Sequence, residues 1–283
     1  MKTRLSASNS VCDLMLGECE QNMQRKVHHD EACLLHLKNG GSRTRAKICI
    51  SVGQKLQLNK SDIVSLSSLV ELLHNASLIH DDVQDDDGQR RGKASIWKVF
   101  GKSRAICSGD TMITAAFGEI ADISSSAKLP IVIRETNRAV QETIEGQNLD
   151  LMCSSAISSS QYELIAAKKS GPLFRLALSL PLILANRHDL LEKVEFVAST
   201  FAIAYQINDD LDDWKEDSSS GDLNLVNILA ETRNTKDAIF IAKNRARYLL
   251  RKCKQELSNF PNDAASIVVD YAETLMNHVE AHH

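Results

Sequence analysis

The sequence predicts an all-α protein. Its 283 residues contain only four prolines, at positions 130, 172, 181 and 261, and 12 glycines. Because residues that form turns are scarce, long helices are favoured over many short strands. Apolar side chains between residues 61 and 80 also follow the i, i+3, i+4, i+7 spacing of one helix face; they are Ile63, Leu66, Leu69, Val70 and Leu73.

The first expected helix covers residues 61–80 and leads directly into an acidic run at Asp81. The segment around Gly88 then reads as a helix end and a loop. Another helix is expected over roughly 131–153. A third is expected over 162–184, bent or broken by its internal Gly-Pro pair and by a second proline.

In the second half of the chain, residues 189–213 form an apolar-rich helical stretch that again ends in acids. The run EDSSSGD at 216–222 reads as a solvated loop. Residues 235–280 read as two amphipathic helices, broken near Pro261. No linker is long enough to divide the chain, so a single domain over residues 1–283 is predicted.

Composition excludes several classes of protein. The chain has 33 Lys and Arg against 37 Asp and Glu, so no overall basic field favours nucleic acid. The seven cysteines are scattered and form no CxxC pair, so neither a disulfide framework nor a structural zinc site is expected. The N-terminus lacks an apolar signal-peptide core, and the most apolar stretch, 172–185, is too short to span a bilayer. A cytoplasmic protein is expected.

Two acidic runs carry the strongest chemical signal. Asp81-Asp82-Val83-Gln84-Asp85 and Asp209-Asp210-Leu211-Asp212-Asp213 each place carboxylates at i and i+4 where an apolar helix ends. Residues four apart on a helix lie about 5–6 Å apart, so these like charges repel one another. Mg²⁺ prefers carboxylate oxygens and keeps other positions for water or phosphate.

Two plainer interpretations compete with a metal site. A single acidic run is usually a solvated surface, but here the run occurs twice in one helical chain. An EF-hand with Gly88 at its sixth position would need ligands at Val83 and Ala94, so that interpretation fails.

Basic residues accompany the acidic runs. Arg90 and Arg91 follow the first run, and Arg43 and Arg45 follow a Gly-Gly pair whose backbone amides can face phosphate. Most such arginines are simply solvated. His74 lies on the helix face that leads to Asp81, and a lone histidine there is more often a core residue.

These residues together resemble the trans-isoprenyl diphosphate synthases, also called polyprenyl synthetases. ELLHNASLIHDDVQDDDGQRRG and YQINDDLDD resemble the two aspartate-rich regions of that family. GGSRTR resembles its glycine loop, KSG at 169–171 its Lys-Thr region, and GQNLDL at 146–151 its Gly-Gln segment. The matches follow the family's order between about residues 38 and 230.

The resemblance implies a bundle of long helices around a deep apolar cavity, assembled as a homodimer. It implies an enzyme that condenses an allylic diphosphate with isopentenyl diphosphate. Three Mg²⁺ ions per site, replaceable by Mn²⁺, would help the allylic C–O bond to ionise. The isopentenyl double bond would then attack the carbocation, and loss of a proton would complete the step.

The resemblance also assigns roles to residues of this chain. It implies metal ligands at Asp81, Asp85 and Asp209, assisted by Asp82 and Asp213. The allylic diphosphate would be contacted by Arg90, Lys169, Ser170 and Gln206, and isopentenyl diphosphate by Arg45, Arg91 and His74.

The chain departs from the family pattern at two places. Ser42 stands where the glycine loop usually carries lysine, and Arg43 is a possible substitute. After the second acidic run the family usually has further lysines, but the only lysine here is Lys215, at the wrong position. Two other interpretations therefore stay open: a related terpene cyclase or diphosphate lyase that acts on one allylic diphosphate, and a non-catalytic partner subunit of a synthase.

The residues before the first Asp predict the length of the product. In the family, side chains four and five positions earlier face the growing tail, and an aromatic residue there stops growth. Here these are Ser77 and Ala76, both small, with Leu73 and Leu72 one turn lower. Each methylene held in an apolar tunnel contributes about 0.8 kcal/mol, so a product of about twenty carbons or more is expected.

Overall fold

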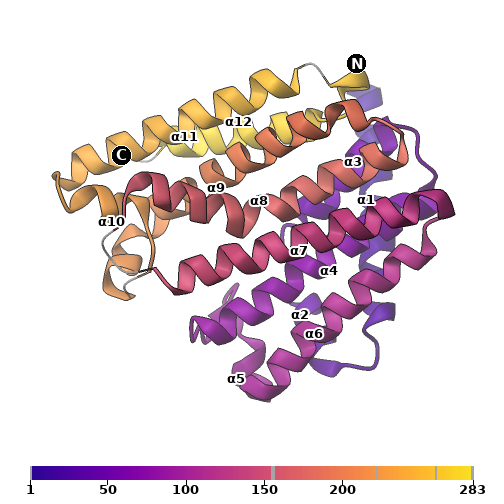
Figure 1. Ribbon diagram of the computed structural model, residues 1–283, viewed down its shortest axis with the longest axis horizontal. Coiled ribbons are helices and arrows are strands. Elements are labelled where there is room, and N and C mark those ends of the chain that lie inside the picture. The colour runs from indigo at the N-terminus through magenta and orange to yellow at the C-terminus, as the bar shows by residue number, and fades with distance from the viewer. Residues whose placement is uncertain (1, 154–156, 221, 259, 282–283) are drawn as a thin grey trace. The chain divides into compact units, whose positions relative to one another are not determined.

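A computed structural model describes residues 2–153, 157–220, 222–258 and 260–281. It confirms the predicted all-α class, because the described residues form twelve α-helices and one two-stranded hairpin (Figure 1). The chain divides into two compact units. Unit 1 contains residues 1–136 and 180–187, and unit 2 contains residues 137–179 and 188–283.

Unit 1 is built around one long helix. Its elements are α1 (Lys2–Lys26), α2 (Glu31–Lys38), α3 (Thr44–Lys55), α4 (Lys60–Gln84), β1 (Gln89–Arg90), β2 (Lys93–Ala94), α5 (Ile96–Phe100), α6 (Lys102–Glu119), and the 3₁₀ turns η1 (Ile120–Asp122) and η2 (Ser126–Lys128). Helices α1, α3 and α6 pack against α4, which explains why α4 is apolar on several faces.

Helix α4 confirms the expected helix and extends it. It begins after Asn59, whose side-chain oxygen accepts a hydrogen bond from the Asp62 amide at 2.8 Å. In the described part of the chain, α4 alone is long and apolar enough to cross a membrane, but most of its apolar window is buried in the protein. Burial of this kind is what a core helix shows.

A polar contact connects three helices of unit 1. Asn22 on α1 donates to both carboxylate oxygens of Glu119 on α6, at 2.8 Å each, and to Ser68 on α4 at 3.1 Å. All three side chains are buried. Because a buried carboxylate without donors is costly, this contact specifies how the three helices align.

Unit 2 contains most of the remaining helices. Its elements are η3 (His188–Leu190), α9 (Leu191–Ser220), α10 (Leu225–Ala230), α11 (Thr235–Leu257), η4 (Pro261–Asp263) and α12 (Ser266–Ala281). Helices α7 (Leu129–Leu151) and α8 (Ser159–Leu184) contribute residues to both units. Helices α11 and α12 run side by side (Figure 1) and both contact α9.

The expectation of a loop at residues 216–222 was wrong. Helix α9 continues through Ser220, so most of the expected loop at 216–222 is helical. The helix is held there by Asn224, whose amide donates to the Asp217 carboxylate at 2.8 Å and to the Asp210 carbonyl at 3.0 Å. Helix α8 is not broken at its prolines, because residues 171–183 are all buried and packing on every side keeps this stretch helical.

His36 on α2 gives unit 1 a defined response to acid. Its ring is buried, and its Nε2 atom has no hydrogen-bond partner. Burial, followed by the charges of Arg91, Arg90 and Arg43, lowers the pKa of His36 to about 3. The unfolded chain therefore takes up this proton at a higher pH than the folded chain does.

We expect the stability contributed by neutral His36 to be complete above about pH 6.5 and to be lost as the pH falls towards 3. Between pH 7.5 and 5.5 the free energy of unfolding, measured in urea, should fall by about 1.4 kcal/mol more in the wild type than in His36→Leu. His29→Leu, at an exposed position, is the control and should keep the wild-type slope. Equal slopes in the wild type and His36→Leu would contradict the prediction.

Candidate functional site

The first acidic run forms the last turn of α4. Asp82 is only 1% exposed, and its Oδ1 atom pairs with the Arg90 Nε atom at 2.5 Å. Its Oδ2 atom is buried and has no hydrogen-bond partner. Burial raises the pKa of Asp82, whereas the pairing with Arg90 opposes that rise. Asp81 is half-buried and Asp85 is exposed at the helix end, so these two carboxylates remain accessible.

The acids that follow Asp85 have structural contacts. Asp86 forms an ion pair with Lys102 on α6. The Asp87 carbonyl accepts a hydrogen bond from the Trp97 indole at 2.7 Å. These contacts attach the chain after α4 to α5 and α6, and they give the Asp86 carboxylate a structural partner.

A tight hairpin positions the two adjacent arginines. Gln89 pairs with Ala94 and Arg90 with Lys93, which leaves Arg91 and Gly92 as a two-residue turn. Both turn residues have positive φ, 54° and 72°, as a type I′ turn requires. The sequence analysis expected only a loop here. The hairpin directs Arg90 towards Asp82 and Arg91 towards the glycine loop.

The glycine loop receives Arg91 at close range. The Arg91 guanidinium donates to the Gly40 carbonyl. Gly41 has a φ of 146°, which L side chains rarely adopt, and a Cβ atom there would also lie 2.8 Å from the Arg91 guanidinium carbon, so the loop favours glycine at this position. Nearby, the Arg45 Nη1 atom lies 3.1 Å from His74 Nε2. The structure thus brings together Arg45, Arg91 and His74.

Arg43 has a structural position. It is 4% exposed, and its guanidinium donates to Glu20 at 3.1 Å, to the Leu37 carbonyl at 2.9 Å and to Asn75 at 3.3 Å. It also pairs with the buried Glu71 at 3.5 Å. Because protein groups occupy this guanidinium, Arg43 does not offer a replacement for the lysine that is missing at position 42. Ser42 itself is exposed.

Unit 1 therefore holds a concentration of positive charge. The pKa of His74 is lowered well below its usual value by burial first and then by Arg45 and Arg91. His36, Asn75 and Glu71 belong to the same surroundings, and the sequence analysis did not single them out. His36 lies on α2, before the glycine loop, and Asn75 lies on α4, after it. In the sequence both read as ordinary residues of a helix core, so no sequence signal identified them.

The second acidic run lies on α9 in unit 2. Asp210 is buried and accepts hydrogen bonds from the Leu225 amide at 2.7 Å and from Gln206 at 3.1 Å. Asp209 is half-buried and Asp213 is exposed. Burial and then the charges of Asp210 and Asp213 raise the pKa of Asp209 to about 7. Burial likewise raises the pKa of Asp210 to about 7.

The Lys-Ser segment of α8 lies against the end of α7. Lys169 pairs with Asp150 at 2.6 Å. A Cβ atom on Gly146 would lie 2.4 Å from the Lys169 amide nitrogen, so glycine permits this helix contact. Lys169 and Ser170 are both half-buried. The structure thus places the Gly-Gln segment beside Lys169, and it shows Asp150 as a partner that the sequence analysis missed.

The donor sets fit a hard divalent cation. The Asp82 Oδ2 atom is buried without a hydrogen-bond partner, and the raised pKa of Asp209 indicates a carboxylate whose charge is unfavourable in its surroundings. Among the described residues, no three His, Cys, Asp or Glu side chains form a complete ligand set. Mg²⁺ does not need one, because it takes one or two carboxylates and completes its shell with water and phosphate.

The small residues expected to face the tail lie on α4. Ala76 is buried and Ser77 is half-buried, and the Ser77 hydroxyl donates to the His74 carbonyl at 2.9 Å. Leu72 and Leu73, one turn earlier, are both buried. No aromatic side chain occupies this stretch of the helix.

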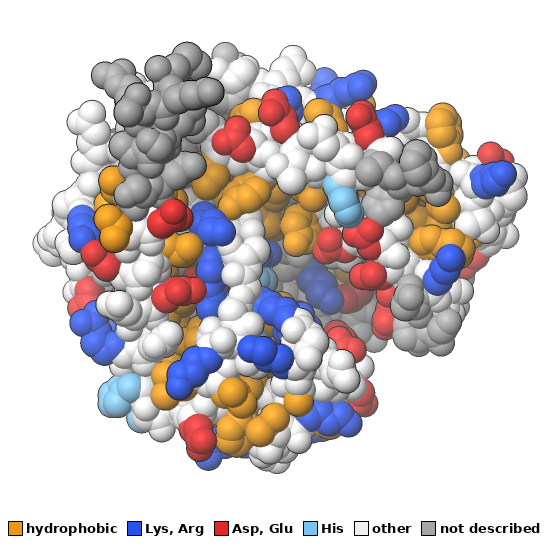
Figure 2. All heavy atoms as spheres, turned by 180° about the vertical axis from the view of Figure 1, so that it is seen from behind, with side chains coloured by type: hydrophobic (Ala, Val, Ile, Leu, Met, Phe, Trp, Pro, Cys, Tyr) orange, Lys and Arg blue, Asp and Glu red, His pale blue; other side chains and the backbone are white. Residues whose placement is uncertain are grey.

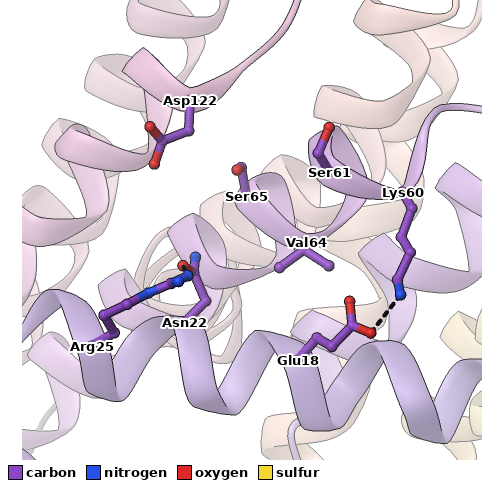
Figure 3. A pocket seen from close by; sticks show the side chains of 8 residues that line it. All are labelled: Glu18, Asn22, Arg25, Lys60, Ser61, Val64, Ser65 and Asp122. Carbon is purple, nitrogen blue, oxygen red and sulfur yellow. Dashed lines mark hydrogen bonds and ion pairs between the residues drawn. The ribbon is translucent and has the colours of Figure 1, made fainter.

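Unit 1 also has a polar pocket that none of these residues lines. It has a volume of about 540 Å³ and lies between α1 and the start of α4 (Figure 3). Lys60 and Glu18 pair across it at 2.5 Å. The pocket is at the opposite end of α4 from the acidic run, so it is separate from the candidate site.

Comparison with known proteins gives the family of the chain. Residues 28–267 match the polyprenyl synthetase family model. A farnesyl diphosphate synthase from Haemophilus influenzae is 31% identical over 246 residues, which cover 82% of this chain and 83% of that protein. A geranylgeranyl pyrophosphate synthase from Geoglobus acetivorans is 29% identical over 81% of this chain and 75% of that protein.

A solved structure shares the fold. The geranylgeranyl pyrophosphate synthetase from the archaeon Geoglobus acetivorans has a TM-score of 0.84, with 24% identity, over 94% of this chain and 97% of that chain. The family match covers most of the chain and contains every residue of the candidate site. The chain therefore belongs to the polyprenyl synthetase family of prenyltransferases.

Proposed function

We propose that the protein condenses an allylic diphosphate with isopentenyl diphosphate, in a Mg²⁺-dependent reaction, to give a longer trans-prenyl diphosphate. The observation that carries the proposal is the pair of Asp-Asp-x-x-Asp runs, one at the end of α4 and the other within α9, in a member of the polyprenyl synthetase family. Metal dependence is general in this family.

In this proposal Asp81, Asp85 and Asp209 hold the metal, with Asp82 and Asp213 assisting. Bound Mg²⁺ supplies Lewis-acid stabilisation of the negative charge that develops on the leaving diphosphate. Asp82 has a second task, because its buried ion pair with Arg90 fixes the hairpin at the end of α4. Mutation of Asp82 is thus expected to affect folding as well as metal binding.

The cationic residues divide between the two substrates. Arg45, Arg91 and His74 lie together and are proposed to bind the diphosphate of isopentenyl diphosphate. Arg90, Lys169, Ser170 and Gln206 are proposed for the allylic diphosphate. Lys169 would exchange its pairing with Asp150 for the substrate. We leave Arg43 out, because its guanidinium is bound to protein groups.

Lysines typical of the family are missing at position 42 and after the second acidic run. Two other functions are therefore tested beside the proposed one. A cyclase or diphosphate lyase would act on an allylic diphosphate alone, and a partner subunit would be inactive by itself. Incubation with allylic diphosphates and Mg²⁺, with and without isopentenyl diphosphate, separates the three. A longer prenyl diphosphate supports our proposal. A hydrocarbon or alcohol, or no product, would support the alternatives.

We extend the proposal to a product of about twenty carbons or more, because Ser77 and Ala76 leave room on α4 above Leu73 and Leu72. We also propose a homodimer in the cytoplasm, with three Mg²⁺ ions per site that Mn²⁺ can replace. Family membership supports the dependence on a metal ion.

The first prediction concerns the metal ligands. Asp81→Ala or Asp209→Ala should lower kcat by at least about a hundredfold, because charge stabilisation at the leaving group is lost. The melting temperature of the metal-free protein should not fall for Asp209→Ala, because the raised pKa of Asp209 reflects an unfavourable environment for its charge. Asp86→Ala, which removes an acid paired with Lys102, is the control and should stay active. Full activity of the wild type in EDTA would contradict the prediction.

The second prediction concerns the exposed Ser42. A lysine there would add a charge-assisted contact of about 1.5–3 kcal/mol to isopentenyl diphosphate. Ser42→Lys should therefore lower the KM for isopentenyl diphosphate about tenfold or more and leave the allylic KM nearly unchanged. Ser103→Lys, which adds the same charge at an exposed position of α6, should change neither KM. An unchanged KM in Ser42→Lys would show that the loop does not face this substrate.

The third prediction concerns product length. Ser77→Phe should shorten the product, because an aromatic ring would fill the space beside Ala76 on α4. Ser77→Ala keeps a small side chain and should leave the product unchanged. Chromatography of the dephosphorylated products measures both. A wild-type product of only about ten or fifteen carbons, or an unchanged product from Ser77→Phe, would show that another helix limits the length.

A further inference from the structure

Helix α11 differs in charge from the rest of the chain. It carries seven Lys and Arg residues and two acids, whereas the whole chain has a net charge of −4. Its inner face is apolar and packs against α9, α10 and α12. The buried residues of that face are Ala238, Ala242, Ala246, Leu249, Leu250, Cys253 and Leu257. The fold of unit 2 thus needs the inner face of α11, but not its outer face.

The outer face of α11 exposes large apolar side chains. Phe240 is 65% exposed, Tyr248 is 51% exposed and Ile241 is 37% exposed. They lie within about two and a half turns of one helix. Figure 2 shows that hydrophobic side chains also reach the surface on one face of the molecule. Single exposed hydrophobic side chains are normal in proteins. Three large ones grouped on one basic helix instead indicate a surface that binds a partner.

Six of the seven cations of α11 fall into two groups. Arg245, Arg247 and Lys254 pair with Glu163, Glu280 and Glu273 of the same unit. In contrast, Lys236, Arg251 and Lys252 form no ion pair with an acid in the part of the chain that the structure describes.

The second group of cations lies beside the exposed apolar residues. Lys252 lies 5.9 Å from the centre of the Tyr248 ring. The opposing acid near the start of the helix, Asp237, is bound by the Asn234 amide at 2.8 Å. Its charge is therefore partly satisfied within the helix cap.

We propose that the α11 outer face, formed by Phe240, Ile241, Tyr248, Lys236, Arg251 and Lys252, binds the surface of an anionic lipid membrane. Aromatic and aliphatic side chains at the interface, flanked by Lys and Arg, are the combination that such surfaces bind. Each cation near an anionic leaflet adds to the attraction. This proposal does not depend on the reaction proposed above.

The observations favour lipid over other occupants of this face. A second copy of the chain would need a contact of about 20–30 residues a side, and three apolar side chains are too few to form its core. A nucleic acid would use the cations but would gain little from an exposed Phe240 and Ile241. An anionic membrane uses both kinds of side chain at once.

Sedimentation of the full chain with vesicles tests the proposal. The vesicles contain phosphatidylcholine alone or with about 30% phosphatidylserine. We expect the wild type to sediment with the anionic vesicles and far less with the neutral ones. Phe240→Ser/Tyr248→Ser and Arg251→Glu should each weaken binding about tenfold or more. Circular dichroism verifies that both variants fold, as expected for exposed positions.

Matched control variants show whether the effect is specific to α11. Val99→Ser/Ile106→Ser removes two exposed apolar side chains from α5 and α6, and Arg134→Glu makes the same charge change on α7. Both should bind like the wild type. No sedimentation of the wild type would overturn the proposal, and so would equal binding by the α11 variants. Binding that falls in Arg251→Glu but survives Phe240→Ser/Tyr248→Ser would indicate a simple polyanion site and would overturn it as well.

Discussion

The ion pair between the buried Asp82 and the half-buried Arg90 is the contact on which the arrangement of unit 1 depends. Asp82 is almost fully buried in the last turn of α4, and leaving such a charge unpaired costs about 3–5 kcal/mol. The chain must therefore turn back within a few residues to bring Arg90 to it. A two-residue hairpin does this, and its positive-φ turn carries Arg91 to the glycine loop. One pair thus positions both arginines.

Only part of this fold could be predicted from the sequence. Helical spacing predicted α4, α7 and α9 because periodic apolar faces are local signals. It did not predict that α9 continues through Ser220, because the contacts of Asn224 with Asp210 and Asp217 depend on the folded chain. It also did not predict the hairpin, because a two-residue pairing has no periodicity to detect.

Among the candidate site residues, identity was predictable but orientation was not. The motif GGSRTR contains two arginines, and the sequence alone treats both as exposed cations. In the structure Arg43 has a left-handed backbone with φ of 52° and turns into the core towards Glu20 and Glu71. Arg45, in the first turn of α3, lies beside His74 instead. The left-handed backbone at Arg43 therefore directs this arginine to structural partners, whereas Arg45 remains a candidate to bind a ligand.

The free protein holds unfavourable charge in both units, with opposite signs. In unit 1, burial and then the charges of neighbouring arginines lower the pKa of His36 and of His74. In unit 2, burial and then the charges of neighbouring carboxylates raise the pKa of Asp209 and Asp210 to about 7. Burial and repulsion of this kind reduce the stability of the folded state. Under the proposed function, a bound diphosphate would offset the first and a divalent cation the second, so part of the binding free energy of each ligand would come from charges that the fold has already brought together.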